Sequence, residues 1–196
     1  MNPGYLVLYP EADGQTVQPE PLLETLRRLG LAGEQVGNAP ERYRTGSAYL
    51  NLITYLGCSP SIPLADGPQD SYCQLRLAGP YPVPVLLSGG NTRPPRCPHC
   101  NHPFADWKGW LDDNGEQPGT CGQCAGTLQL ADLRWREQAA LARLFVLISH
   151  VFPGEAVPVE RLMANLRREG GDWHHAYVQK PCIWRPDKGW VMLGED

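Results

Sequence analysis

Four cysteines in two C-x-x-C pairs are the residues of this sequence whose types and spacing point most clearly to chemistry. Cys97 and Cys100 form the first pair, and Cys121 and Cys124 form the second after twenty intervening residues. Each C-x-x-C makes a tight turn whose two thiolates face one point about 2.3 Å away, the length of a zinc–sulfur bond. Four thiolates fill a tetrahedron and leave no open coordination position. The spacing therefore predicts a structural metal site.

The residues around the cysteines suit tight metal-binding turns. Pro98 stiffens the first turn, and Gly122 gives the second a backbone freedom that residues with a Cβ lack. Asn101 and Gly126 follow the two turns, where a positive φ is often needed. Between the pairs, Asn114 and Gly115 form a strong hairpin signal, so we expect a hairpin there.

Residues 91–127 resemble a zinc ribbon, a rubredoxin-like module of two cysteine turns and a hairpin. The resemblance implies one structural zinc ion, because about 30 residues cannot bury a sufficient core alone. An iron-bearing rubredoxin-like centre, a redox-active C-x-x-C and ligation by His99 or His102 are the alternatives. Many unrelated proteins carry such a module, so it does not name a function.

Two similar segments flank the ribbon. Residues 17–30 align with residues 157–170 at a constant offset of 140, and seven of the fourteen positions are identical. Both segments are amphipathic, with Pro near the start and Gly at the end, so both predict helices. The strand candidates around these helices are residues 5–9 and 48–56, of which the latter is alternatively a short helix, and residues 143–149 and 173–178.

The order strand–helix–strand, present twice, predicts an α+β fold with a ferredoxin-like split βαβ sheet built from two similar halves. We expect the N-terminal half over residues 1–90, the inserted ribbon over 91–127 and the C-terminal half over 128–196. Strand candidates 72–77 and 83–87 lead into the ribbon, and 128–136 leads out. A different mixed sheet and a chance likeness of the two helices are the competing interpretations.

The charge balance argues against nucleic acid as the main partner. The net charge is −4, and only 3 of the 17 basic residues are Lys, whereas phosphate binding favours a basic surplus. One argument for nucleic acid remains, since four arginines occupy matching positions of the two predicted helices. These residues, which would form one basic patch, are Arg27, Arg28, Arg167 and Arg168.

Trp107 and Trp110 stand on the predicted ribbon hairpin, and all six tryptophans lie in the second half of the chain. Aromatic side chains are enriched at binding hot spots. These two indoles either dock onto the chain's own sheet or form an exposed surface for a protein partner.

Three other residues are candidates for an unrecognised enzyme site. Cys58 follows an apolar segment, but no base lies near it in sequence, so a buried thiol is the alternative. Glu155 lies in a loop between strand and helix, and His174 lies on a predicted strand. His175 would face the opposite side of that strand from His174, because side chains alternate.

The N-terminus has no basic segment followed by an apolar one, and no apolar run approaches 18 residues. We therefore expect no signal peptide and no membrane partner. Paired C-x-x-C motifs indicate a reducing compartment, so we expect a cytoplasmic protein. Our first hypothesis is a zinc-binding, non-catalytic interaction or adaptor protein that binds another protein or itself. Nucleic-acid binding and an unrecognised enzyme are the alternatives.

Overall fold

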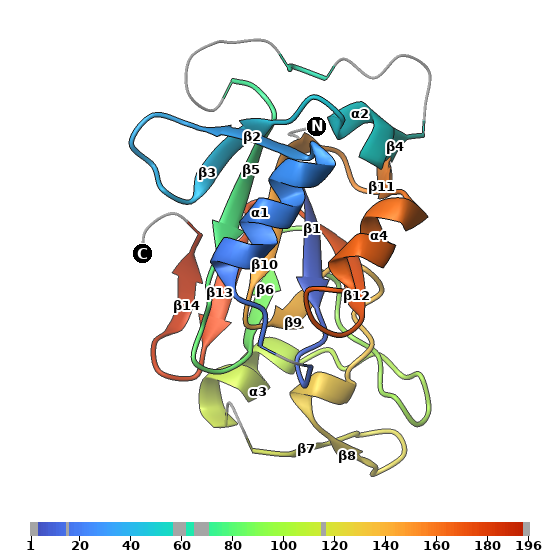
Figure 1. The fold of residues 1–196 in the computed structure, drawn as a ribbon. Coiled ribbons are helices and arrows are strands. Elements are labelled where there is room, and N and C mark those ends of the chain that lie inside the picture. The colour runs from blue at the N-terminus through green and yellow to red at the C-terminus, as the bar shows by residue number, and fades with distance from the viewer. Residues whose placement is uncertain (1–3, 15, 57–61, 65–70, 115–116, 194–196) are drawn as a thin grey trace.

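The computed structural model describes residues 4–14, 16–56, 62–64, 71–114 and 117–193, and Figure 1 shows their arrangement. The protein is a mixed α/β structure with mostly antiparallel sheets and few helices. Its helices are α1 (Pro19–Leu29), α2 (Tyr49–Leu52), α3 (Trp107–Asn114) and α4 (Glu160–Leu166), with a 3-10 turn at Leu130–Asp132. No helix within these ranges is long and apolar enough to cross a membrane.

The largest sheet has six strands in the order β12-β1-β10-β5-β3-β2, and all neighbouring strands are antiparallel. The strands are β12 (Trp173–Val178), β1 (Gly4–Pro10), β10 (Phe145–Val151), β5 (Gln74–Ala78), β3 (Arg42–Thr45) and β2 (Ala32–Gln35). Two short strands, β4 (Ile53–Tyr55) and β11 (Ala156–Pro158), pair with each other as a separate antiparallel sheet.

The central strands β1 and β10 are apolar on both faces, so each face packs against another layer. In β1, Leu6 and Leu8 belong to the core under the helices, whereas Val7 belongs to a second core on the other face. In β10, Ile148 belongs to the core under the helices and Leu147 belongs to the second core. This division follows from the alternation of side chains along a strand.

Helices α1 and α4 cover one face of this sheet and touch each other (Figure 1). Leu22 and Leu26 of α1 and Leu162 and Leu166 of α4 are fully or almost fully buried there. Helix α1 ends at Gly30, whose φ of 77° lets its N–H reach the carbonyls of the last turn.

A second sheet covers part of the opposite face. Its four strands run in the order β14-β13-β6-β9 and are β14 (Gly189–Met192), β13 (Cys182–Arg185), β6 (Val85–Ser88) and β9 (Ala140–Ala142). Val85, Leu87 and Ile183 face the large sheet, whereas Leu86 and Trp184 face away from it. The chain between the cysteine pairs packs on that outer side.

Several local predictions were wrong or incomplete. The segment expected to form a hairpin at Asn114 is helix α3, and Gly115 lies outside the described residues. Residues 128–136 are no continuous strand, because β8 (Thr127–Leu128), paired with β7 (Gly119–Thr120), is followed by the 3-10 turn. Residues 48–56 divide into α2 and β4, which combines the two alternatives.

Candidate metal centre

The two cysteine turns have the same backbone hydrogen bonds. In the first, the N–H of Asn101 donates to the carbonyl of Cys97, and the N–H of Cys97 donates to the carbonyl of His102. In the second, Ala125 donates to Cys121, and Cys121 donates to Gly126. Each turn therefore closes on its first cysteine and presents both sulfurs on one side.

The residues that follow the turns fit this geometry in two different ways. Asn101 has a φ of 61°, as predicted, but in the second turn the positive φ of 54° belongs to Ala125 rather than to Gly126. Glycine is needed at 126 for another reason. A Cβ there would lie 2.6 Å from Cδ2 of His99, so the ring packs directly on the glycine backbone.

The four sulfurs converge on one point. The Sγ atoms of Cys97 and Cys124 are 3.8 Å apart, those of Cys100 and Cys121 are 3.7 Å apart, and all four lie within 4.8 Å of one another. A tetrahedron with zinc–sulfur bonds of about 2.3 Å has edges of about 3.8 Å. The cysteines therefore fit a tetrahedral metal ion.

The backbone around Cys121 favours a thiolate. The N–H groups of Cys124 and Gln123 point at its sulfur and lower the pKa of Cys121 to about 6. A backbone hydrogen bond at His102 lowers the pKa of Cys100, but burial and hydrogen bonds to the other three thiols outweigh it and raise that pKa to about 12. Without a cation, four adjacent sulfurs hold protons between them, and a divalent ion would replace those protons.

The described metal cluster does not include the two histidines near the site. Nε2 of His99 lies 3.1 Å from the carbonyl oxygen of Thr127. His102 contributes its backbone carbonyl to the first turn. Among the described residues, the cluster that suits a metal consists of the four cysteines.

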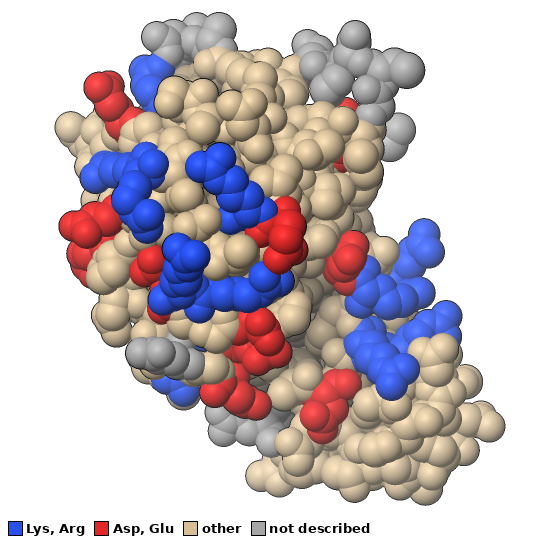
Figure 2. Space-filling model, turned by 45° about the vertical axis from the view of Figure 1, so that its right-hand side comes forward, with Lys and Arg blue, Asp and Glu red and all other residues tan. Residues whose placement is uncertain are grey.

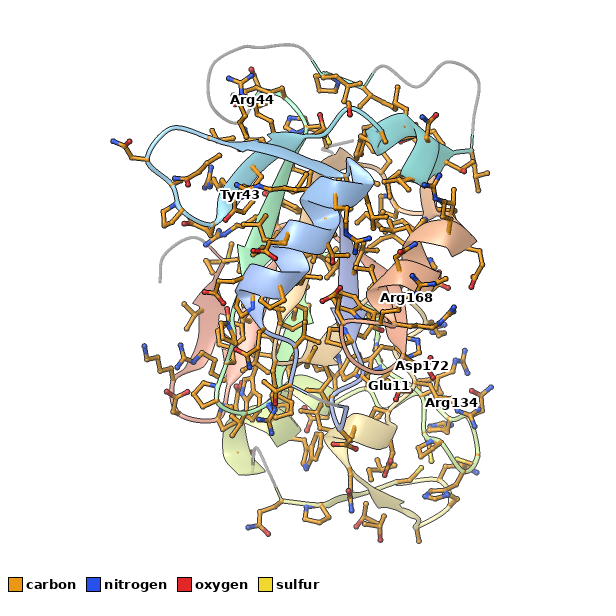
Figure 3. All side chains as sticks on the ribbon, viewed as in Figure 1. Glu11, Tyr43, Arg44, Arg134, Arg168 and Asp172 are labelled. Carbon is orange, nitrogen blue, oxygen red and sulfur yellow. The ribbon has the colours of Figure 1, made fainter. Side chains whose placement is uncertain are left out.

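Two arginines brace the first turn. Arg96 and Arg134 exchange backbone hydrogen bonds, at 3.0 and 3.1 Å. The Arg96 side chain donates to the carbonyl of Asn101, and the Arg134 side chain, labelled in Figure 3, donates to that of Pro98. Sequence reasoning missed both residues, because long-range pairing through residue 134 leaves no local signal.

The aromatic side chains between the cysteine pairs attach this region to the second sheet. Trp107 and Trp110 are 3% and 9% exposed and share a core with Leu86 and Trp184 of that sheet. Both indoles therefore pack against the chain's own structure. Trp190, to which no sequence signal gives a role, joins this packing. Its ring meets that of Trp107 edge-on at a centroid distance of 5.8 Å, and its Nε1 donates to Asp112.

The four arginines of the predicted basic patch are exposed but have acidic groups near them, and two of the four, Arg167 and Arg168, follow the end of α4. Arg167 pairs with Glu160 at 2.6 Å and with Asp172 at 3.5 Å. Arg28 donates to Thr25, which in turn donates to Glu169, and Arg27 stacks over the Tyr43 ring. Basic and acidic side chains lie side by side on the face seen in Figure 2.

Of the three enzyme candidates, the structure describes Glu155 and His174, which lie near opposite ends of β12. Cys58 lies outside the described residues. Glu155 precedes β11, and the next residue, Ala156, accepts a hydrogen bond from Tyr177 near the end of β12. His174 lies near the start of β12, 3.5 Å from Glu11.

Comparisons with known proteins leave the cysteine geometry as the principal guide to function. No family model, no curated protein and no solved structure matches this chain.

Proposed function

We propose that this protein is a non-catalytic binding protein in which one structural zinc ion holds the segment between the cysteine pairs as a ribbon-like insertion against the second sheet. The convergence of four sulfurs carries the proposal, because a closed set of thiolates leaves zinc no position for water or substrate. Zinc is the metal that such a tetrahedral thiolate site most commonly binds, and iron is the competing ion.

The strand order supports a ferredoxin-like unit as the scaffold. The series β12-β1-β10-β5, with α1 after β1 and α4 between β10 and β12, is the order of a split βαβ sandwich. Under this proposal the zinc region is inserted between β5 and β10. The aligned helices support two similar halves, since Leu22 and Leu162 are equally buried, as are Leu26 and Leu166.

A groove beside the metal region is the proposed protein-binding surface. This ribbon groove, of about 420 Å³, is lined mostly by apolar side chains, among them Val83, Leu130, Trp184 and Pro186. Trp110 also lines it, and its buried Nε1 has no hydrogen-bond partner within the part of the chain that the structure describes. A backbone carbonyl of a bound protein segment would supply the missing acceptor.

The cysteines also support a cytoplasmic location. The six cysteines in the described residues are all free thiols, including Cys73 and Cys182, which lie outside the metal cluster. Reduced thiols persist in a reducing compartment.

The test is affinity capture with chemical crosslinking from the cells that make the protein. The groove variant is Val83→Asp, because that side chain is 44% exposed and a charge there would leave the core intact. The matched control is Leu50→Asp, on a 54% exposed side chain of α2. We expect a protein that crosslinks to the wild type and to the control but not to Val83→Asp.

Two results would contradict the proposal. Equal crosslinking by both variants would remove the groove as the binding surface. Captured material that disappears on nuclease treatment would instead favour the nucleic-acid hypothesis, in which the predicted arginine patch is the binding surface.

A further inference from the structure

The ribbon groove continues into a second cavity, which has a volume of about 280 Å³. We call this cavity the carboxylate pocket, and its lining includes Tyr9, Glu11, Trp135, Arg136, Glu137 and His174. Ala12, Ala131 and Leu141 line both the groove and the pocket, so the two cavities are continuous. A ligand in the groove therefore has the carboxylate pocket directly beside it.

A third cavity, of about 330 Å³, extends the groove further, because Val83 and Pro186 line both. Three cavities with shared walls suit an occupant that lies across all of them. An extended protein segment has that shape, since each residue adds about 3.3 Å to its length, whereas a compact small molecule fills a single pocket. The series of cavities therefore favours a chain segment as the occupant.

The two carboxylates of the pocket come from different parts of the chain. Glu11, labelled in Figure 3, follows β1, and its Oε1 lies 3.5 Å from Nε2 of His174 on β12. Glu137 lies in the turn before β9, and its carbonyl accepts a hydrogen bond from the N–H of Tyr177, which holds this turn against β12. The side chains of Glu11 and Glu137 are 53% and 61% exposed, so a ligand in the pocket can reach both.

No Lys or Arg forms an ion pair with Glu11 or Glu137. All 17 Lys and Arg residues lie within the ranges that the structure describes. Arg136 lines the same pocket without an ion pair to either carboxylate. The ion-pair partners of Glu11 and Glu137 are His174 and His175, at 3.5 and 3.9 Å, and an imidazole offsets a carboxylate only when it is protonated. The pocket therefore keeps negative charge that a cationic ligand would offset.

The charge of Glu137 acts on the tyrosines of the neighbouring strands. Burial, and after it the negative charge of Glu137, raises the pKa of Tyr9 in β1 to about 12. The same two causes, in the same order, raise the pKa of Tyr177 in β12 to about 12. A cation bound beside Glu137 would offset this charge.

Aromatic rings beside the carboxylates also suit a cation. Tyr9 and Trp135 line the pocket, and the ring centroid of Tyr9 lies 5.7 Å from that of His174. The faces of Trp and Tyr rings attract ammonium and guanidinium groups. Lysine and arginine side chains combine an apolar stem with a charged head, so the stem would pack on the rings while the head meets the carboxylates.

We propose that the protein segment bound in the ribbon groove places a lysine or arginine side chain in the carboxylate pocket. This inference rests on the proposed function, because it states the chemistry of the partner for the same groove. Apolar side chains of the segment contact Val83, Leu130 and Trp184, and its basic side chain lies between Glu11 and Glu137. The carboxylates would repel a segment with an acidic residue at this position, so they select the partner by charge.

The first experiment is selection from a display library of random peptides on the full-length, metal-containing protein, in parallel with the groove variant Val83→Asp. We expect enriched peptides in which Lys or Arg accompanies apolar residues and which do not bind Val83→Asp. Fluorescence anisotropy then measures the affinity of an enriched peptide for each variant. Glu11→Gln and Glu137→Gln each weaken it about threefold, and the double variant weakens it about tenfold. Glu34→Gln, the same change on an exposed glutamate of β2, leaves it unchanged.

A change in the peptide completes the test. Norleucine in place of the basic residue keeps an apolar stem and removes the charge. It weakens binding to the wild type about tenfold and has no further effect in the double variant, because the two changes remove the same interaction. Circular dichroism and metal content confirm that each variant is folded.

The outcomes separate this inference from the proposed function. Peptides that fail to bind Val83→Asp but show no preference for Lys or Arg, or that bind both glutamine variants as tightly as the wild type, would overturn the inference and leave the groove as the binding surface. Equal weakening by Glu34→Gln would show a general charge effect and overturn the inference as well. Absence of any peptide that prefers the wild type to Val83→Asp would overturn the groove itself, and the inference with it.

Discussion

The sulfurs of Cys100 and Cys121 lie 3.7 Å apart although twenty residues separate them in the chain. The two cysteines come from turns with the same backbone hydrogen bonds, so each turn presents its sulfurs in the same way. Beneath them lies a core of aromatic residues that belongs partly to this segment and partly to the second sheet. We therefore expect metal binding and docking of the segment to be coupled.

Replacement of one ligand tests this coupling. Cys121→Ser is expected to lose the metal and to release α3 from the second sheet, because the segment's own core is too small to hold it. Metal analysis and tryptophan fluorescence report the two effects, since five of the six tryptophans belong to this core or pack against it. Cys182→Ser, a half-buried thiol outside the cluster, is the control and keeps both signals. An unchanged fluorescence spectrum in metal-free Cys121→Ser would disprove the coupling.

Replacement of Trp107 tests the same coupling from the docking side rather than from the metal side. Its ring meets those of Trp135 and Trp190 edge-on at 5.0 and 5.8 Å. Trp107→Ala is expected to lower the free energy of unfolding by about 3 to 5 kcal/mol, the usual cost of such a cavity. Hydrogen exchange should quicken in α3, and a chelator should remove the metal more readily than from the wild type, because the coupling is reciprocal. A loss smaller than about 1 kcal/mol would mean that the indole does not secure the segment.

For the segment between the cysteine pairs, the sequence predicted the cysteine cluster but not helix α3. The cysteine spacing predicted the cluster, because two short turns carry all four ligands. The hairpin prediction relied on Asn114 and Gly115, but Trp107, Trp110 and Leu111 are spaced as one face of a helix. Burial of that face against Leu86 and Trp184 favours the helix over the turn.

The central strands of the large sheet and the helices that cover it could be predicted in part. The apolar strands around residues 5–9 and 143–149 and the two amphipathic helices correspond to β1, β10, α1 and α4. The second sheet was not predicted as a unit, because its strands come from three distant parts of the chain. Their pairing depends on long-range register, which a single sequence does not display. The same reason hid the convergence of Glu11 and Glu137 on one pocket.

One hydrogen bond joins the two helices of the proposed ferredoxin-like unit. Thr25 of α1, only 5% exposed, donates to Oε1 of Glu169 after α4 at 2.6 Å. Thr25→Val keeps the shape of the side chain and leaves the carboxylate without its donor. It should therefore cost about 1 to 3 kcal/mol in urea unfolding. Arg161→Ala on exposed α4 surface should cost less than about 0.5 kcal/mol, and equal effects of the two changes would contradict the role of Thr25.

The buried thiol of Cys73 gives the protein an alkaline limit. Burial raises the pKa of Cys73 from 9.0 to about 11. The folded state therefore keeps a proton that the unfolded chain loses. The resulting stability is complete below pH 9 and is lost as the pH rises through 11, a decrease of about 2 to 3 kcal/mol.

Unfolding of the wild type and of Cys73→Ala across this pH range measures the effect. The variant should show the shallower decrease, and identical slopes would show that the thiol does not contribute. Because the thiol stays protonated near neutral pH, it should also alkylate slowly in the folded protein. Fast alkylation would revive a reactive cysteine and, with it, the enzyme hypothesis.

We propose one zinc ion held by four thiolates, those of Cys97, Cys100, Cys121 and Cys124. Zinc K-edge X-ray absorption of the protein as purified, quantified per chain, tests it most directly. We expect about one zinc per chain with four sulfur neighbours at about 2.3 Å. An absent zinc edge, or a first shell in which nitrogen or oxygen replaces one of the sulfurs, would contradict it.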